Sequence, residues 1–549
     1  MRLLEKSFCI ALITTLMVAA APAQTSGEVT KPQYSLDERL TQLQETIAAQ
    51  QEAITNQGKQ ISEQRQEINT LRQRLEGQSQ AISTTSGKEA ASLLNASLTS
   101  TSATMPVAAH ETQEAEKPKE SPLSFRIGGA EFTPGGFADL TAFWRNTNPG
   151  TGYGTNFFSI PFHDTIPGQL TETRLTAENS RITLKANYKF KSNDVTGYYE
   201  MDFHGNDPAN LNVTSNSSTM RLRQFWVDIR RKQWEVLAGQ AWSWLTPNRV
   251  GMSAMPADVF YSQNVDANYQ LGLTWTRAPQ VRFVYHANDH LGLGVALENP
   301  DQFAGQAGQV TFPAAFNTPA VTTQFDLANQ TTTPNVMPDI IPKIAYDTDV
   351  AGKHFHVEAV GLVTRVRALP ALGATKNSVT GGGGSLNMNL EVVRNFRLIA
   401  TSFFSDGGGR YIFGSGPGTV LRPDGTVSLV HASSGVAGFE WQMTGKNLIA
   451  AYYGADYFSR NFFLDTSTGA KPNTFVGFGG PGSSNAANRS IQESTLDWVT
   501  TFWKSPQYGT LQLMTQGSYL TRSPWNVPLN TPKNARSTMI WTNLRYVLP

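Results

Sequence analysis

The stretch SRITLKANYKFKSNDVTGYYEMDFHG, residues 180–205, alternates apolar and polar side chains twice, with four polar residues between the two runs. Because successive side chains of a strand point to opposite faces, the pattern predicts a β-hairpin with one apolar and one charged face. Such a hairpin occurs both in soluble β-sandwiches and in membrane barrels. The apolar members of the two runs are Ile182, Leu184, Ala186, Tyr188 and Phe190, then Val195, Gly197, Tyr199, Met201 and Phe203.

The N-terminal segment 1–23 has the features of a secretory signal peptide. Two basic residues precede an apolar run (8–20), and the small residues Ala-Pro-Ala form a cleavage site before residue 24. The only cysteine, Cys9, lies in this segment, so we expect a mature chain without disulfides or thiol chemistry. The chain is almost neutral, with 44 Lys and Arg against 43 Asp and Glu, and this balance gives no reason to expect nucleic-acid binding.

A second periodicity occupies residues 36–82. Apolar residues recur at every seventh position, and a second series, partly Gln, precedes each of them by four residues. Such heptads predict a coiled coil and therefore self-association, but they leave the number of helices open. Segment 24–35 precedes this stalk, and the Ser-, Thr- and Ala-rich segment 83–123 predicts a flexible linker. The predicted coiled-coil core is Leu40, Ile47, Ile54, Ile61, Ile68, Leu75 and Ile82.

Residues 124–549 read as strands whose connections alternate in length. Seven short polar turns, such as KSND (191–194) and RRKQ (230–233), alternate with eight long loops rich in Gly, Asn, Thr and Pro. Fifteen connections predict sixteen strands. An even number of antiparallel strands, with the short turns at one end and the long loops at the other, is typical of outer-membrane barrels. The predicted fold class is therefore an all-β transmembrane barrel of about sixteen antiparallel strands with an N-terminal α-helical coiled coil.

The alternation also predicts which side chains face lipid. The apolar series that begin at Ile182 and Val195 would face lipid, and the charged series that begin at Arg181 and Thr196 would face a water-filled lumen. The strand RLRQFWVDIR (221–230) is mixed, because its arginines share a period-two face with aromatic and aliphatic residues. Its orientation stays open at this point.

Several segments in order resemble the DcaP-like porins of the bacterial outer membrane. They are the hairpin above, RLRQFWVDI (221–229), VLAGQAWS (236–243), APQVRFVYH (278–286), ALENP (296–300) and MPDIIPKIAYD (337–347). The resemblance extends over most of residues 36–549 and is densest between 180 and 347. It implies a trimeric, sixteen-stranded porin that takes up small anionic solutes, carboxylates among them.

A pore selects by the charge and the width of its narrowest part. In barrels of this kind the third long loop commonly folds inward, and here that loop would be 244–268, with Arg249, Asp258 and Asp266. Each basic residue on the wall or on this loop could instead be solvated or ion-paired and play no part in selectivity. The predicted pore-lining and selectivity residues are Arg181, Lys185, Arg221, Arg223, Arg249 and Arg282.

Two other functions fit the same pattern. The stalk could tether the outer membrane to periplasmic cell-wall components, or the barrel could be a hydrolase, which would need a nucleophile beside a histidine. No such motif stands out, and His354 and His356 read as a polar pair because no third ligand lies nearby. We therefore expect a homotrimeric porin in outer-membrane lipid, with its coiled coil in the periplasm and without cofactor, metal or enzymatic activity.

Overall fold

The computed structural model describes residues 121–549 except for 206–217, 256–259, 266–268, 307, 328–332, 468–473 and 528. The predicted signal peptide, the segment 24–35, the coiled coil and almost all of the linker lie outside the described residues.

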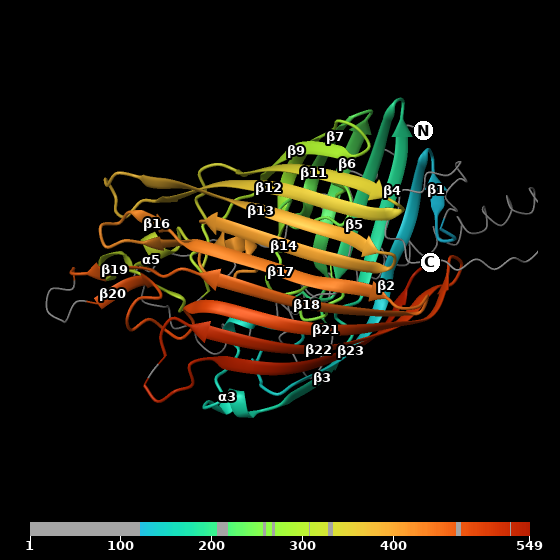
Figure 1. Ribbon diagram of the computed structural model, residues 1–549. Coiled ribbons are helices and arrows are strands. Elements are labelled where there is room, and N and C mark those ends of the chain that lie inside the picture. Colours follow the sequence, from blue (N-terminus) through green and yellow to red (C-terminus); the bar gives the residue numbers. More distant parts are fainter. Residues whose placement is uncertain are drawn as a thin grey trace, which may run out of the picture. The chain divides into compact units, whose positions relative to one another are not determined.

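An antiparallel sheet closes on itself to form a barrel (Figure 1). Each barrel strand pairs with the next one along the chain, and the last, β23, pairs with β2. Two of the eighteen strands in the sheet do not add a position to the ring. The short β1 forms a hairpin with the start of β2, and β3 and β4 pair with successive parts of β2 as one interrupted strand. Sixteen positions remain around the barrel, as the loop lengths predicted.

The barrel strands are long and are joined by short turns at one end and long loops at the other (Figure 1). They are β2 (Ala130–Arg145), β3 (Glu172–Thr176) with β4 (Arg181–Phe190), β5 (Asn193–Asp202), β6 (Arg221–Arg231), β7 (Trp234–Trp242), β8 (Arg277–His286), β9 (Leu291–Glu298), β11 (Asp339–Val350), β12 (Lys353–Ala368), β13 (Asn377–Val393), β14 (Phe396–Asp406), β17 (His431–Gln442), β18 (Asn447–Phe458), β21 (Asn488–Ser505), β22 (Gly509–Pro524) and β23 (Ala535–Val547).

The long loops carry the minor elements. We call residues 146–171 loop 1, residues 243–276 loop 3, residues 299–338 loop 4 and residues 407–430 loop 6. Among the described residues, no helix has the length and apolarity that crossing a bilayer requires. The minor elements are β1 (Phe125–Ile127), β10 (Val310–Thr311), β15 (Thr419–Leu421), β16 (Val427–Leu429), β19 (Asn461–Asp465), β20 (Thr474–Phe478), α3 (Ile166–Gln169), α5 (Pro319–Thr322) and 3-10 turns at Phe157–Ser159, Ala314–Phe316 and Gly409–Tyr411.

The opening hairpin has the predicted sorting of faces. β4 and β5 pair so that Ile182 lies opposite Met201, and the charged Arg181 lies opposite Asp202. Ile182 is exposed on the outer surface, whereas Arg181 and Asp202 are buried. The turn comprises only residues 191–192 and is shorter than the predicted KSND, because Lys191 adopts a left-handed conformation with φ of 55°.

The mixed strand β6 changes face at a β-bulge. The register against β5 shifts between Glu200 and Met201, so that Arg223 has no partner opposite it. Arg223 and the next residue, Gln224, are therefore both on the buried side, and both are 0% exposed. Beyond the bulge the outward series resumes with Phe225, which is 61% exposed. One inserted residue thus lets Arg221 and Arg223 face inward while Phe225 and Val227, which share their period-two series, face outward.

The two faces of the wall differ in chemistry. The outward face presents large apolar side chains such as Ile344, Leu496 and Leu544, which is the pattern of a lipid-facing surface. The inward face is polar and charged, yet much of it is buried because the long loops fold against it. In the largest apolar cluster, Phe157 of loop 1 and Tyr269 of loop 3 pack with Trp541 of the wall. The interior is therefore a partly filled lumen.

Candidate functional site

Loop 3 lies inside the barrel and contacts the wall at widely separated strands. Arg249 forms an ion pair with Glu440 of β17, with 2.7 Å between Nη1 and Oε2, and Gln270 donates to Glu493 of β21 at 3.1 Å. The predicted inward course of the loop is therefore correct for its described part. Asp258 and Asp266, which were predicted within it, lie outside the described residues.

A glycine permits the closest approach between loop 3 and the wall. A Cβ on Gly454 of β18 would lie 1.7 Å from the carbonyl oxygen of Leu271, so no larger residue fits there without moving the loop. On the loop side, Gly272 has φ of 94°, and a Cβ on it would lie 2.2 Å from the carbonyl oxygen of Gly435. Backbone thus packs directly on backbone where loop 3 crosses β17 and β18.

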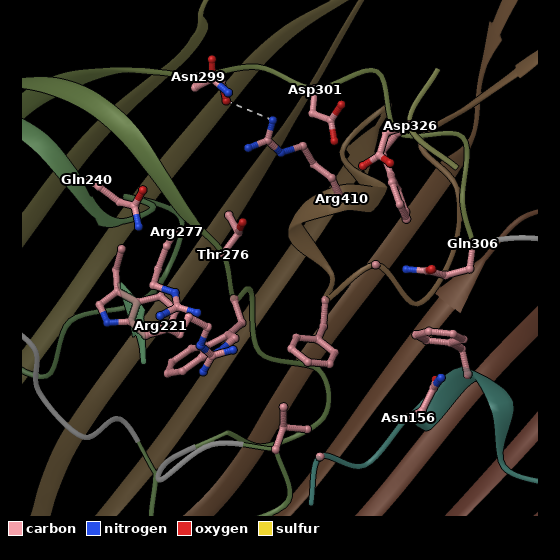
Figure 2. Close-up of a pocket in the computed structure, with 18 of the residues that line it drawn as sticks. Asn156, Arg221, Gln240, Thr276, Arg277, Asn299, Asp301, Gln306, Asp326 and Arg410 are labelled. Atoms are coloured by element: carbon pink, nitrogen blue, oxygen red, sulfur yellow. Dashed lines mark hydrogen bonds between the residues drawn. The ribbon is translucent and has the colours of Figure 1, made fainter. Parts of the chain in front are cut away.

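A cavity of about 830 Å³ opens at the long-loop end of the barrel (Figure 2). It is lined by the loop-side ends of β6, β7 and β8 together with parts of loops 1, 3, 4 and 6. Its charged lining residues come from four segments that are distant in sequence: Arg221, Arg277, Arg410, Asp301 and Asp326. Figure 2 shows Arg221 and Arg277 on one side of this cavity, with Arg410 and the two aspartates on the other.

The first side of the cavity is basic and aromatic. Arg221 binds the Asp202 carboxylate through Nε and Nη2 at 3.0 and 2.6 Å, and 35% of its side chain remains exposed. The Arg277 guanidinium lies 5.1 Å from the Trp242 ring, which in turn contacts Trp275 with 3.8 Å between the ring centroids. Cation–π contact and aromatic packing of this kind fix the orientation of a guanidinium. The arginines are thus held in place at the cavity wall.

The second side of the cavity carries a carboxyl pair. Burial and the hydrogen bond with Asp326, opposed by the nearby Arg410, together raise the pKa of Asp301 in loop 4 to about 7. Thr333 donates to Asp301 at 3.1 Å, and Arg410 donates to the carbonyl oxygen of Asn299 at 3.0 Å. The charge of the Asp301 carboxyl therefore changes near neutral pH.

Three predicted selectivity residues form one charged cluster on the wall. Arg181 lies 3.8 Å from Glu200, Arg223 binds both Glu200 and Asp202, and Arg221 binds Asp202. Among the described residues, three guanidinium groups therefore contact the same two carboxylates. Of the three, only Arg221 lines the cavity; Arg181 and Arg223 are buried beside it.

The other predicted residues lie apart from this cluster. Arg249 is paired with Glu440 on the far side of loop 3, and Arg282 is buried, with Nε donating to Gln280 at 2.6 Å. Lys185 is half-buried on β4. Sequence reasoning missed Arg277 and Arg410. The first begins β8, and the second follows three glycines in loop 6, so neither belongs to an alternating run.

The histidine pair has carboxylate partners. His356 Nδ1 lies 2.8 Å from Asp347, and His354 Nδ1 lies 3.1 Å from Asp349. Among the described residues, no group of three or more His, Cys, Asp or Glu side chains is placed to hold a metal ion. Both histidines are thus held by carboxylates of β11.

The closed antiparallel barrel, with short turns at one end, long loops at the other and two unlike faces, has the architecture of outer-membrane β-barrels. Among solved structures, the chain is similar to the outer membrane channel DcaP of Acinetobacter baumannii, with a TM-score of 0.54 and 17% identity over 76% of this chain and 97% of that one. The predicted resemblance is thus supported at the level of the fold.

Two further solved structures are less similar. OprB of Pseudomonas putida has a TM-score of 0.42 and 10% identity over 75% of this chain and 94% of its own. OmpF of Salmonella typhi has a TM-score of 0.39 and 9% identity over 77% and 100%. No protein-family model matches the chain, and no curated protein matches it either.

Proposed function

We propose that this chain is a diffusion porin of the bacterial outer membrane that passes small hydrophilic solutes and favours anions such as carboxylates. The single observation that carries the preference is the excess of guanidinium groups at the cavity. Among the described residues, three arginines line the cavity, Arg221, Arg277 and Arg410, against two aspartates, and the pKa of one of these, Asp301, is raised to about 7.

This charge distribution attracts anions by ordinary electrostatics. A fixed unit charge about 8 Å from a permeating ion in water changes its energy by about 0.5 kcal/mol, with opposite signs for anions and cations. The ratio of anion to cation permeability then changes by about 1 kcal/mol, or about fivefold, for each unit charge. Transport of this kind is passive and involves no catalytic step or cofactor.

The assembly is part of the same proposal. The heptads of residues 36–82 would join three chains through a coiled coil in the periplasm, while the apolar outer faces of the barrels contact lipid. The exposed apolar series on the strands supports the membrane location, and the heptads support self-association. The trimer, as opposed to another oligomer, rests on the resemblance to DcaP-like porins.

Liposome swelling tests the proposal. Proteoliposomes should admit a small carboxylate faster than a cation of similar size. The double variant Arg221→Gln/Arg277→Gln should reduce that ratio at least about fivefold, the effect of one unit charge. Arg230→Gln is the matched control, because it removes an arginine from the opposite end of β6, away from the cavity. A ratio that stays the same in the double variant would contradict the assignment of the cavity.

A further inference from the structure

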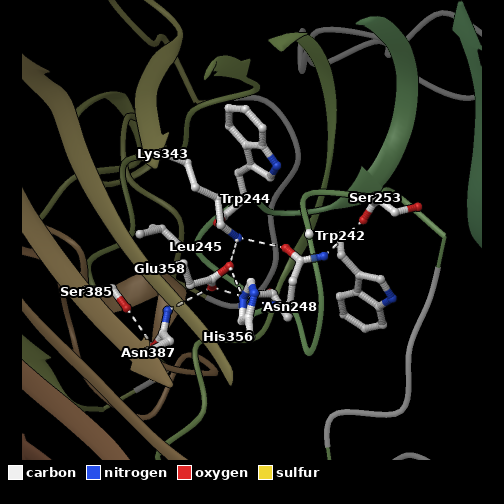
Figure 3. Close-up of polar contacts among 12 residues, drawn as sticks. Trp242, Trp244, Leu245, Asn248, Ser253, Lys343, His356, Glu358, Ser385 and Asn387 are labelled. Carbon is white, nitrogen blue, oxygen red and sulfur yellow. Dashed lines mark hydrogen bonds and ion pairs between the residues drawn. The ribbon is translucent and has the colours of Figure 1, made fainter. Parts of the chain in front are cut away.

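A fully buried ion pair lies where loop 3 leaves the wall at β7 and enters the lumen (Figure 3). Lys343 of β11 and Glu358 of β12 are both 0% exposed at the side chain, with 2.8 Å between Nζ and Oε2. Removing two charges from water is costly, and such a pair is stable only when further hydrogen bonds satisfy both groups. Those further partners show what the pair holds.

Loop 3 supplies several of these partners. Lys343 Nζ donates to the carbonyl oxygen of Trp244 at 3.2 Å and to Asn248 Oδ1 at 2.8 Å. Glu358 Oε1 accepts from the backbone N–H of Asn248 at 3.2 Å and from Asn387 of β13 at 3.0 Å. Both members of the ion pair therefore bind the same short stretch of loop 3.

The contacts continue along the loop. His356 lies between Glu358 and Asp347, and both carboxylate oxygens of Asp347 lie 3.1 Å from the backbone nitrogen of Gly251. Asn389 of β13 donates to the carbonyl oxygen of Arg249 at 3.0 Å. Side chains of β11, β12 and β13 thus hold residues 244–251 through the backbone of the loop.

No helix or strand of its own orders this stretch. Residues 243–255 contain neither, so the position of the loop depends on side-chain contacts with the wall. This stretch also makes apolar contacts with the wall: Trp244, Leu245 and Met252 are buried in one cluster with wall residues. Hydrophobic contact is not directional, whereas the ion pair and its hydrogen bonds are. The ion pair and its hydrogen bonds are therefore the contacts that can fix the position of the loop along the wall.

We propose that the Lys343–Glu358 pair is a latch that positions loop 3 against the β11–β13 wall and thereby keeps the lumen open. The predicted effect on conductance rests on the proposed porin function. The predicted effect on the position of the loop does not. Lys343 and Glu358 act through loop 3 and are positioning residues. Without the latch, segment 244–251 moves into the lumen and closes the pore intermittently.

The first test records single channels in planar bilayers. Lys343→Met and Glu358→Gln should each raise the frequency of brief closures at least about tenfold, and Lys343→Arg should restore most of the wild-type behaviour because it keeps the charge. Lys353→Met is the matched control: it removes a lysine that donates to the carbonyl oxygen of Val392 on the wall. Equal closure frequencies in folded Lys343→Met and wild type, or an equal increase in the control, would overturn the proposal.

The second test measures the loop directly. Ser253 is exposed on loop 3, and the mature chain is expected to contain no cysteine, so a spin label at Ser253→Cys reports on the mobility of the loop. The label should be restricted in the parent chain and mobile with Lys343→Met or Glu358→Gln. If Lys343→Met does not fold, the test uses Glu358→Gln, which keeps the shape of the side chain and removes its charge. Unchanged label mobility refutes the latch even if the protein conducts, whereas a wild type without conductance refutes only the porin function.

Discussion

The anion preference should depend on pH through Asp301. Burial and the hydrogen bond with Asp326 place the pKa of this carboxyl at about 7, above that of an exposed aspartate. Asp301 is therefore neutral below this value and negative above it. Raising the pH from about 5 to about 9 adds about one negative charge to the cavity, so the preference for anions should fall with rising pH.

The expected size follows from Coulomb's law. At about 8 Å, which is one Debye length at physiological salt, a unit charge in water changes the energy of an ion by about 0.5 kcal/mol. Because anions and cations respond with opposite signs, the permeability ratio should fall about fivefold over this pH range. Screening reduces the effect at high salt, so the measurement belongs at low ionic strength.

The assay is the zero-current potential in a salt gradient at several pH values. Asp301→Asn retains an oxygen that can accept the hydrogen bond from Thr333 but removes the titrating carboxyl. This variant should lose most of the pH dependence and should resemble the wild type at acid pH. A wild type with the same permeability ratio at both ends of the range, or a variant that keeps the full dependence, would refute the reasoning.

Three further perturbations test separate parts of the structure. Arg223→Ala should destabilise the folded barrel by about 3–5 kcal/mol in urea titrations, because it removes the buried guanidinium that binds both Glu200 and Asp202; a loss below about 1 kcal/mol would contradict the ion-pair assignment. Gly454→Ala should lower the free energy of unfolding by about 1–3 kcal/mol in the same assay, because its Cβ would overlap the Leu271 carbonyl. Gly517→Ala is the control, because a Cβ there meets nothing within 4 Å. Deletion of residues 36–82 should weaken oligomers on native gels and leave the conductance of each barrel unchanged; lost conductance from folded barrels would favour a different role for the stalk.

The sequence predicted the barrel because its signals are local. Turn length and period-two alternation can be read within ten residues, and they predicted the number of strands and the hairpin of residues 180–205. The bulge at Arg223 escaped this reasoning, because one inserted residue reverses the faces without changing the composition of the strand. A binary pattern contains no separate signal for it.

The candidate site was predicted only in part, because its partners are distant in sequence. Arg249 was predicted within an inward loop, but its pairing with Glu440 spans 191 residues and is visible only in the folded barrel. Arg221 was predicted and lines the cavity, whereas Arg277 and Arg410 reach it from a strand start and from a glycine-rich loop. The latch residue Lys343 belongs to an alternating strand, and nothing in that pattern shows which loop it binds.

The zero-current potential of the wild-type protein at neutral pH tests the central claim most directly. Purified protein in a planar bilayer with a salt gradient should give stepwise conductance and a potential whose sign shows that anions permeate faster than cations. Open channels that favour cations would contradict the charge assignment at Arg221, Arg277 and Arg410. Folded barrels that do not conduct at all would contradict the porin function itself.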